Sequence, residues 1–380
     1  MTKRVRRNLS RRRSTKRSQR RLRKRLTKRR LSKRRLSKRR LSKRRVRRGG
    51  KPEEEPTKGS TEGYKVERLE QLGITEDTTE VNLNNRVAVN DGTIHEILDD
   101  LTVLPNLQSL DLDLNQLTAL PDSLGNLKSL QKLNLYGNQL TALPEELFSE
   151  GNLPNLKELD LSYNRLTALP DSLGNLPNLQ MLSLEGNQLT ALPEELFSEG
   201  KFPNLQTLSL EKNQLTALPE ELFSEGNLPN LQTLDLEGNQ LTAVPKSLGN
   251  LSNLQKLYLD SNQLTTLPDS LGNLPNLQEL NLGNNALTAV PVWIGNLSNL
   301  QTLYLGLNKL SALPETLGTL SNLRILILGY NQLTEIPSSL SELPNIEKLD
   351  LRGNQITNID QNPVVVALRG LRGRDLEVLV

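Results

Sequence analysis

The sequence predicts an α/β solenoid, built by stacking about eleven short repeats behind a basic N-terminal head. The phrase seen in "LQTLDLEGNQL" returns eleven times with small changes. Its fixed asparagines recur about every 23–26 residues along the chain. Apolar and polar residues alternate within each phrase, as in a strand with one buried face. Periods of this size are typical of solenoids, in which one repeat cannot bury its own leucines but a stack can.

Each repeat is expected to contain a strand, a turn and a short return. In "LDLEGN" (234–239), Leu234 and Leu236 alternate with Asp235 and Glu237, which predicts the strand. The asparagine that follows suits a tight turn, because it tolerates left-handed backbone geometry. Segments such as "LPDSLGN" predict a helical or 3-10 return. Proline suits its first turn, an acidic residue complements the helix dipole, and glycine suits its C-terminal end.

The repeated phrase resembles the leucine-rich repeat family, whose pattern is L-x-x-L-x-L-x-x-N-x-L, over residues 107 to about 356. The resemblance implies a horseshoe-shaped solenoid with a parallel β-sheet on its concave face. Return segments such as "TALPDSLGNLPN" are most similar to the intracellular, Ras-group repeats of plants and to related animal scaffold proteins. In this family the fixed asparagines stack into a structural ladder. Here they are Asn115, Asn138, Asn164, Asn187, Asn213, Asn239, Asn262, Asn285, Asn308, Asn331 and Asn354.

Shifts in composition divide the chain into five parts. A helix is expected over 93–101, where apolar residues share one face before the first repeat. The last residues mix apolar and charged side chains without further repeats. Both ends of a solenoid must be covered, so these segments are predicted caps. The expected parts are a disordered head at 1–48, a flexible Gly- and Pro-bearing linker at 49–64, an N-terminal cap at 65–104, the solenoid at 105–360 and a C-terminal cap at 361–380.

The head and the body carry opposite charges. Residues 1–48 contain 28 of the 48 lysines and arginines and none of the 43 acidic residues, so residues 49–380 have a net charge of −23. Such a block of like charges is expected to be disordered. Three interpretations stay open: nonspecific binding of DNA, RNA or another polyanion, nuclear targeting, or binding back to the acidic body. The head has no aromatic residue to stack on bases, which argues against base recognition.

A five-residue unit repeats within the head. "RRLS" occurs three times and ends at Ser32, Ser37 and Ser42. This arrangement matches the preference of basophilic protein kinases, so the three serines are candidate phosphorylation sites. Each phosphate would add about −1.5 to −2 charges and weaken polyanion binding. The alternative is simple expansion of a low-complexity unit.

Several classes of site are excluded by residue content. The chain has no cysteine, a single histidine (His95) and no nucleotide-binding motif, so no catalytic residue, cofactor site or metal site is predicted. No apolar run approaches the length of about 20 residues that a membrane-spanning helix needs, so no membrane span is expected. We therefore expect a non-enzymatic, monomeric protein in an intracellular setting, cytoplasmic or nuclear.

The resemblance places partner binding on the outward-facing strand residues of the concave face. Their character changes along the array, from an acidic stripe to a zone richer in tyrosine and apolar residues. The candidate residues are Glu185, Glu211, Asp235, Glu237, Tyr258, Asp260, Tyr304, Leu307, Ile327 and Tyr330. Exposed aromatic residues are favoured in binding sites, and nearby glycines leave room for a ligand. The alternative is a solvated acidic face that keeps the protein soluble.

These observations favour a scaffold or adaptor that binds unknown protein partners on the concave face. The polybasic head would add polyanion binding or nuclear targeting. A second hypothesis makes the head the working part of a chromatin, virion or ribonucleoprotein component. A third, by analogy with the family alone, is an effector or receptor-like protein that senses other proteins.

Overall fold

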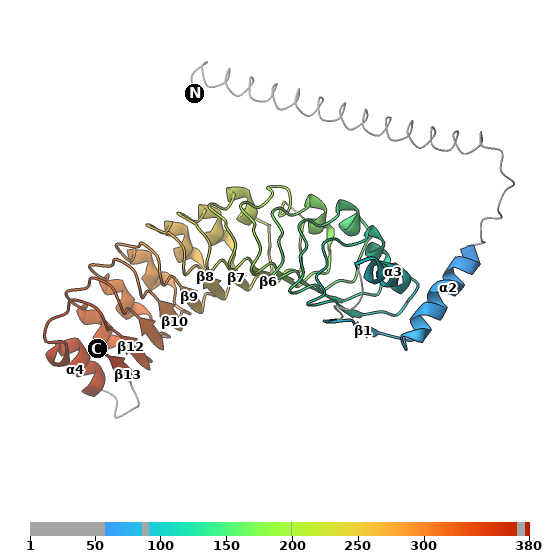
Figure 1. Cartoon of the computed structure of the whole chain (residues 1–380). Helices are drawn as coiled ribbons and strands as arrows, with labels where there is room; N and C mark the ends of the chain where they lie inside the picture. Colours follow the sequence, from blue (N-terminus) through green and yellow to red (C-terminus); the bar gives the residue numbers. More distant parts are fainter. Residues whose placement is uncertain (1–57, 86–90, 199, 371–376) are drawn as a thin grey trace, which may run out of the picture. The chain divides into compact units, whose positions relative to one another are not determined.

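The computed structural model describes residues 58–85, 91–198, 200–370 and 377–380, and residues 62–380 form one compact unit. Within this unit the chain winds as a solenoid whose strands line the inner, concave side of the curve (Figure 1). The predicted α/β solenoid with a parallel sheet is therefore confirmed. The predicted head, with Ser32, Ser37 and Ser42, lies outside the described residues.

The sheet has thirteen parallel strands in chain order, each of three residues. They are β1 (Glu80–Asn82), β2 (Ser109–Asp111), β3 (Lys132–Asn134), β4 (Glu158–Asp160), β5 (Met181–Ser183), β6 (Thr207–Ser209), β7 (Thr233–Asp235), β8 (Lys256–Tyr258), β9 (Glu279–Asn281), β10 (Thr302–Tyr304), β11 (Ile325–Ile327), β12 (Lys348–Asp350) and β13 (Glu377–Leu379). Equivalent residues pair across neighbouring strands, as Leu234 pairs with Leu257. The same position in successive repeats therefore forms a column of side-by-side neighbours.

The first and last strands come from outside the eleven repeats. Strand β1 pairs with β2, and β13 pairs with β12. Each cap thus supplies a strand that continues the sheet. Repeat counting misses these two strands because their sequences lack the full repeated phrase.

Most repeats return through a 3-10 helix. These are η1 (Asp122–Asn126), η2 (Glu145–Phe148), η3 (Asp171–Asn175), η4 (Glu220–Phe223), η5 (Lys246–Asn250), η6 (Asp269–Asn273), η7 (Val292–Asn296), η8 (Glu315–Thr319), η9 (Ser338–Glu342) and η10 (Ile359–Gln361). A proline precedes each of η1 to η9, at the N-cap position and not in the first turn as the sequence predicted. The backbone of these prolines is extended, as in Pro121 with φ of −75° and ψ of 141°, which is typical of a residue that precedes a helix.

The predicted reason for the glycine of "LGN" is wrong. In η5, Gly249 lies one residue before the helix ends and does not have the left-handed backbone of a terminating glycine. A Cβ atom at this position would lie 2.2 Å from the backbone oxygen of Ser270 in the next repeat. Gly318 meets Ser339 in the same way, at 2.4 Å. Glycine is needed here because neighbouring returns pack too closely for a side chain.

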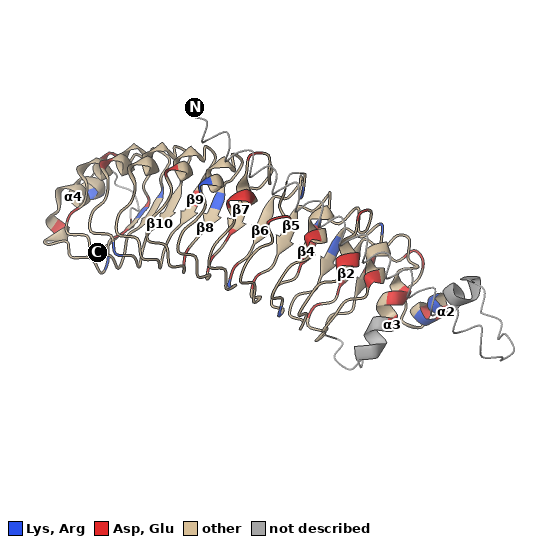
Figure 2. Ribbon diagram, turned by 90° about the horizontal axis from the view of Figure 1, so that it is seen from above, with Lys and Arg blue, Asp and Glu red and all other residues tan. Residues whose placement is uncertain are grey.

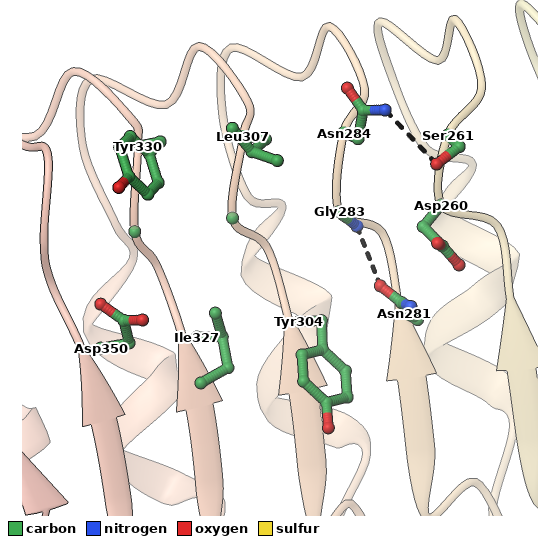
Figure 3. Close-up of a pocket in the computed structure, with 12 residues that line it drawn as sticks. Asp260, Ser261, Asn281, Gly283, Asn284, Tyr304, Leu307, Ile327, Tyr330 and Asp350 are labelled. Carbon is green, nitrogen blue, oxygen red and sulfur yellow. Dashed lines mark hydrogen bonds between the residues drawn. The ribbon is translucent and has the colours of Figure 1, made fainter.

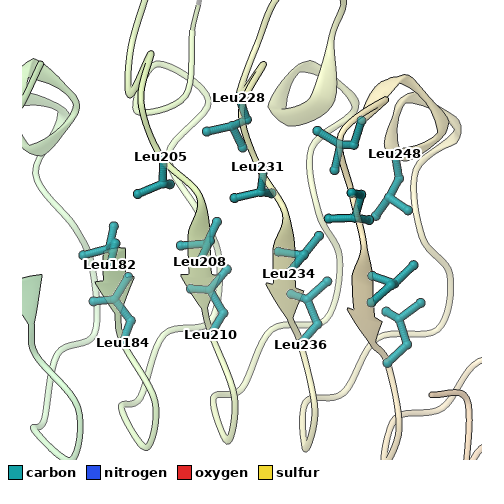
Figure 4. Packing of buried hydrophobic residues seen from close by; sticks show 14 of the residues in the cluster. Leu182, Leu184, Leu205, Leu208, Leu210, Leu228, Leu231, Leu234, Leu236 and Leu248 are labelled. Carbon is teal, nitrogen blue, oxygen red and sulfur yellow. The ribbon is translucent and has the colours of Figure 1, made fainter. Parts of the chain in front are cut away.

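The core is a stack of leucines between the sheet and the returns. Leu208, Leu210, Leu234 and Leu236 repeat the same arrangement in adjacent strands and are fully buried (Figure 4). Three repeats have 26 residues where the others have 23, and their phenylalanines are also buried: Phe148, Phe197 and Phe223. A side chain of this size contributes about 1.5–3 kcal/mol when it is fully buried.

The eleven fixed asparagines form a ladder beside this core. Asn239 is typical: its Nδ2 donates to the carbonyl oxygens of Leu210 (2.9 Å) and Leu236 (3.1 Å), and its Oδ1 accepts from the backbone N–H of Leu215 (3.1 Å). The amide therefore satisfies backbone groups of its own repeat and the preceding one. Buried backbone groups need such partners wherever strand pairing stops.

Helices cover both ends of the core. Helix α3 (Asp91–Leu101) contains the predicted helix, with Leu98 and Leu101 buried, and His95 belongs to it. Helix α4 (Pro363–Gly370) buries Val365 and Leu368 at the other end. Each helix thus covers apolar side chains that would otherwise face solvent.

The predicted flexible linker at 49–64 needs a correction. Residues 49–57 lie outside the described residues, but helix α2 (Lys58–Gln71) begins inside the predicted linker. Its last turns are held by burial of Leu69 and by Arg68, whose guanidinium contacts the carboxylate of Asp100 at 2.7 Å. These tertiary contacts stabilise a helix that the polar sequence of this segment does not predict.

Candidate functional site

The predicted acidic stripe is a cluster of carboxylates on the concave face. Glu211, Asp235 and Glu237 each offer an oxygen within 4.8 Å of the others. Glu185 lies one repeat before Glu211, and Asp260 one repeat after Glu237, at the equivalent position of their repeats. We call these five residues the acidic cluster. Acidic residues recur along the described repeats, whereas basic residues are scattered among them (Figure 2).

One lysine contacts the acidic cluster directly. Lys212 Nζ lies 2.6 Å from Glu211 Oε1 and 3.1 Å from Glu185 Oε1. Tyr163 donates its hydroxyl to the same Glu185 oxygen. Asp235, Glu237 and Asp260 form none of the ion pairs found among the described residues. The cluster thus keeps a surplus of negative charge.

Burial and mutual repulsion make two of these carboxyls harder to ionise. Burial, together with the charges of Glu211, Glu237 and Glu185, raises the pKa of Asp235 to about 6. Burial and the charges of Glu237, Asp235 and Glu211 raise the pKa of Asp260 to about 7. Any cationic group that reached this face would find carboxylates lacking compensating charge.

Beside the acidic cluster lies a hollow of about 370 Å³. Its walls come from the ends of β8 to β12 and the turns that follow them (Figure 3). The lining residues are Asp260, Ser261, Asn281, Gly283, Asn284, Tyr304, Gly306, Leu307, Ile327, Gly329, Tyr330 and Asp350. Gly283, Gly306 and Gly329 occupy the position of Asp260 in the next three repeats, so no side chain beyond Cα fills this column there.

Leu307 and Tyr330 stand out on the rim of this hollow. Their side chains are 57% and 59% exposed, although large apolar groups usually avoid water. Both residues have left-handed backbones, with φ of 59° and 61°. A left-handed conformation costs about 1–2 kcal/mol for a residue that carries a Cβ. Neither burial nor backbone preference accounts for a leucine and a tyrosine here.

The left-handed backbone that the sequence led us to expect at each fixed asparagine lies instead at the residue immediately before it. Four repeats place glycine there, which suits this backbone, and the other seven do not. The positions are Leu114, Gly137, Tyr163, Gly186, Lys212, Gly238, Ser261, Asn284, Leu307, Tyr330 and Gly353. A Cβ on Gly353 would lie 2.7 Å from the ring of Tyr330, so this glycine also gives the tyrosine room. The alternation with glycine is visible in the sequence and could have pointed to this column.

A second exposed apolar patch lies towards the N-terminal end of the sheet. The rings of Tyr136 and Tyr163 lie 5.2 Å apart at an angle of 57°, and Leu114 beside them in the array is 46% exposed. Sequence reasoning missed Tyr136 and Tyr163 because they lie in separate repeats, outside the tyrosine-rich zone. Their contact depends on the pairing of β3 with β4.

The structure separates the predicted site residues into two groups. Asp260, Tyr304, Leu307, Ile327 and Tyr330 come together around the hollow. The other acidic candidates belong to the acidic cluster. Tyr258 does not line the hollow, but it pairs with Asp235 of the acidic cluster across β7 and β8, and its hydroxyl donates to Glu279 Oε2 at 3.0 Å. Asn281, Asn284 and Asp350 line the hollow although the sequence did not single them out.

The chemistry available here is that of binding. Glu211, Asp235 and Glu237 are spaced so that they could hold a cation, but clustered acidic groups on an open face are common without one. Among the described residues, no helix is long and apolar enough to cross a membrane. Apolar rim residues, glycine-made space and a carboxylate surplus are features of a surface that holds another molecule.

Models of the leucine-rich repeat match residues 137–189, 203–264, 252–310 and 298–356, and a model of two such repeats matches residues 105–149. Together these matches cover more than half of the chain. The chain belongs to the leucine-rich repeat family. A search of curated proteins finds no significant match.

Solved structures from several organisms are similar to the chain. An internalin of Listeria monocytogenes has a TM-score of 0.60 at 23% identity, over 84% of this chain and 94% of that chain. The Toll–Spätzle complex of Drosophila has a TM-score of 0.59 at 28% identity, over 68% of this chain and 39% of that chain. A leucine-rich repeat protein of Leptospira interrogans is 29% identical over 83% of this chain and 98% of that chain, with a TM-score of 0.47. The comparisons establish the family and not the Ras-group subtype.

Proposed function

We propose that the chain is a non-enzymatic scaffold or adaptor that holds a protein partner on its concave face, at the hollow between Asp260 and Asp350. Leucine-rich repeat domains typically mediate protein–protein interaction. The observation that carries the proposal is the pair Leu307 and Tyr330, which are exposed, apolar and left-handed at the rim. An intracellular setting, cytoplasmic or nuclear, belongs to the same proposal and rests on the absence of cysteine.

Site-specific photo-crosslinking tests this proposal. A photoreactive amino acid at Leu307 should crosslink a partner protein in lysate. The matched control is Val292, which is 70% exposed but lies in the return helix η7, away from the sheet. Crosslinking at Val292 with none at Leu307 would place binding elsewhere and contradict the proposal.

The basic head supports a second candidate function, binding of nucleic acid or another polyanion. The observation behind it is the charge of residues 1–48, with 28 basic and no acidic residues. Polyanion binding through such a segment falls steeply with added salt, because it releases counterions. Comparing nucleic-acid affinity of the full chain and of residues 58–380 at two salt concentrations tests it. Equal affinities would exclude the head as the binding element.

A further inference from the structure

The acidic cluster and the two exposed apolar patches lie one after another along the same sheet. The Tyr136–Tyr163 patch lies at β3 and β4, the cluster follows along the middle strands, and the Leu307–Tyr330 patch lies at β10 and β11. The order along the sheet is therefore apolar, anionic, apolar. A ligand that satisfies all three needs cationic groups in its middle and bulky apolar groups towards its ends.

The distance between the patches sets the length of such a ligand. The repeats of Tyr163 and Tyr330 are seven strands apart in the sheet. Neighbouring strands lie about 4.8 Å apart, which gives roughly 34 Å between the patches. An extended peptide advances about 3.3 Å per residue, so about ten residues cover this distance.

We infer that the concave face binds an extended basic peptide, with two bulky apolar side chains about ten residues apart and several lysines or arginines between them. The inference rests on the proposed function and specifies the chemistry of the partner. Charge complementarity supports it, because the surplus carboxylates of the cluster repel phosphate and favour cations. The same surplus argues against nucleic acid or an anionic membrane as the ligand of this face.

A sequence with this composition is available as a probe. The segment "LSKRRLSKRRL" (31–41) has leucines ten residues apart at its ends and six basic residues between them. A synthetic peptide of this sequence can be offered to residues 58–380. This part of the chain contains the buried core described above, from Leu69 to Leu368, and the asparagine ladder.

Fluorescence anisotropy with the labelled peptide tests the cluster first. Replacing Asp235→Asn together with Glu237→Gln should weaken binding by about tenfold at low salt, because two unpaired carboxylates are lost. The control pair, Asp171→Asn with Asp269→Asn, removes the same charge from exposed positions in the return helices η3 and η6. Equal weakening by both pairs would mean that net charge alone drives binding, and would overturn the inference.

The apolar anchors need a separate test. Replacing Leu307→Gly together with Tyr330→Gly should weaken binding by about tenfold, because the peptide would no longer bury its apolar groups against these two side chains. The same variant should not lose thermal stability, because glycine suits the left-handed backbone. A peptide of the same composition with all three leucines adjacent should also bind more weakly. If that peptide bound as tightly as the probe, the spacing argument would fail.

The two experiments separate the inference from the proposed function. If Leu307 crosslinks a partner but the basic peptide does not bind residues 58–380, the concave site stands and its inferred chemistry is wrong. If neither occurs, both fail. Tight peptide binding that the Leu307 and Tyr330 substitutions leave unchanged would also overturn the inferred anchors.

Discussion

At the residue scale, the asparagine ladder shows how one side chain can serve two repeats. Asn239 is buried and makes four hydrogen bonds to backbone groups of its own repeat and the preceding one. Its amide supplies both a donor and an acceptor within one small group, a combination that no apolar residue of similar size offers. The ladder residue is therefore constrained by chemistry more strongly than the leucines around it.

Replacing Asn239→Ala should lower the free energy of unfolding by about 3 kcal/mol, since it leaves several buried backbone groups without partners. Urea unfolding followed by circular dichroism measures the change. The control is Asn253→Ala, at an exposed side chain whose Nδ2 donates one hydrogen bond to the carbonyl oxygen of Pro229 (2.8 Å). Equal losses in the two variants would show that the ladder has no special role.

The acidic cluster, in contrast to the asparagine ladder, lowers the stability of the fold at neutral pH. The pKa of Asp235 is about 6 in the fold, above its ordinary value of 3.8, so the folded state binds more protons than the unfolded state between these values. The contribution of this group to stability is therefore lost as pH rises through about 4 to 6. Asp260, with a pKa of about 7, acts in the same direction up to slightly higher pH.

Replacing Asp235→Asn should therefore raise stability at pH 7.5 by about 1 kcal/mol, after discounting for solvent screening of a half-buried group. The substitution keeps local geometry, because Asn134 and Asn281 occupy the same position in other repeats and accept the same type of backbone hydrogen bond, at 3.0 and 3.1 Å. Thermal unfolding at pH 4 and pH 7.5 measures the effect. A gain that is as large at pH 4 would contradict the electrostatic cause.

At the element scale, the returns are packed as tightly as the sheet. Helices η1 to η9 begin after a proline, and most of them contact the return helix of the next repeat. Their glycines allow backbone of one repeat to approach backbone of the next. The tighter 3-10 geometry suits segments this short, which hold too few residues for a stable α-helix.

Replacing Gly249→Ala should destabilise the protein by about 1–3 kcal/mol, because the new methyl group meets the backbone oxygen of Ser270, which cannot move aside cheaply. Differential scanning calorimetry provides the measurement. Gly370→Ala is the matched control, since nothing lies within 4 Å of a Cβ at that position and alanine favours the helix that ends there. A neutral Gly249→Ala variant would disprove the close-packing explanation.

At the scale of the whole molecule, two regions of opposite charge belong to one chain. The repeats carry the acidic cluster, and residues 1–48 carry 28 basic side chains. Molecules that bind the two regions electrostatically should therefore carry charges of opposite sign. Phosphorylation at Ser32, Ser37 and Ser42 would lower the positive charge of residues 1–48.

Replacing Ser32, Ser37 and Ser42 with glutamate in the full chain should weaken DNA or RNA binding. Three added negative charges should lower the slope of log affinity against log salt by up to about 3. Filter binding across a salt series measures this slope, and the corresponding alanine variants control for loss of the hydroxyls. Unchanged affinity of the glutamate variant at the same salt would exclude a charge switch.

Much of the fold follows from local pattern. The regular recurrence of the repeated phrase and the alternation around Leu234 and Leu236 predict stacked strands, and the resemblance to the leucine-rich repeat family implies the asparagine ladder. These features depend on residues within one repeat, or on the same position in each repeat. The solenoid and its family could therefore be recognised without coordinates.

Contacts between different positions of neighbouring repeats were decided only by the tertiary structure. Parallel pairing in exact alignment brings Asp235 near Glu211, and Tyr136 beside Tyr163, although the members of each pair belong to different repeats. The gathering of Leu307 and Tyr330 with Asp260 around one hollow is likewise seen only in three dimensions. Local sequence determines what each repeat is, whereas the packing of one repeat on the next determines which side chains act together.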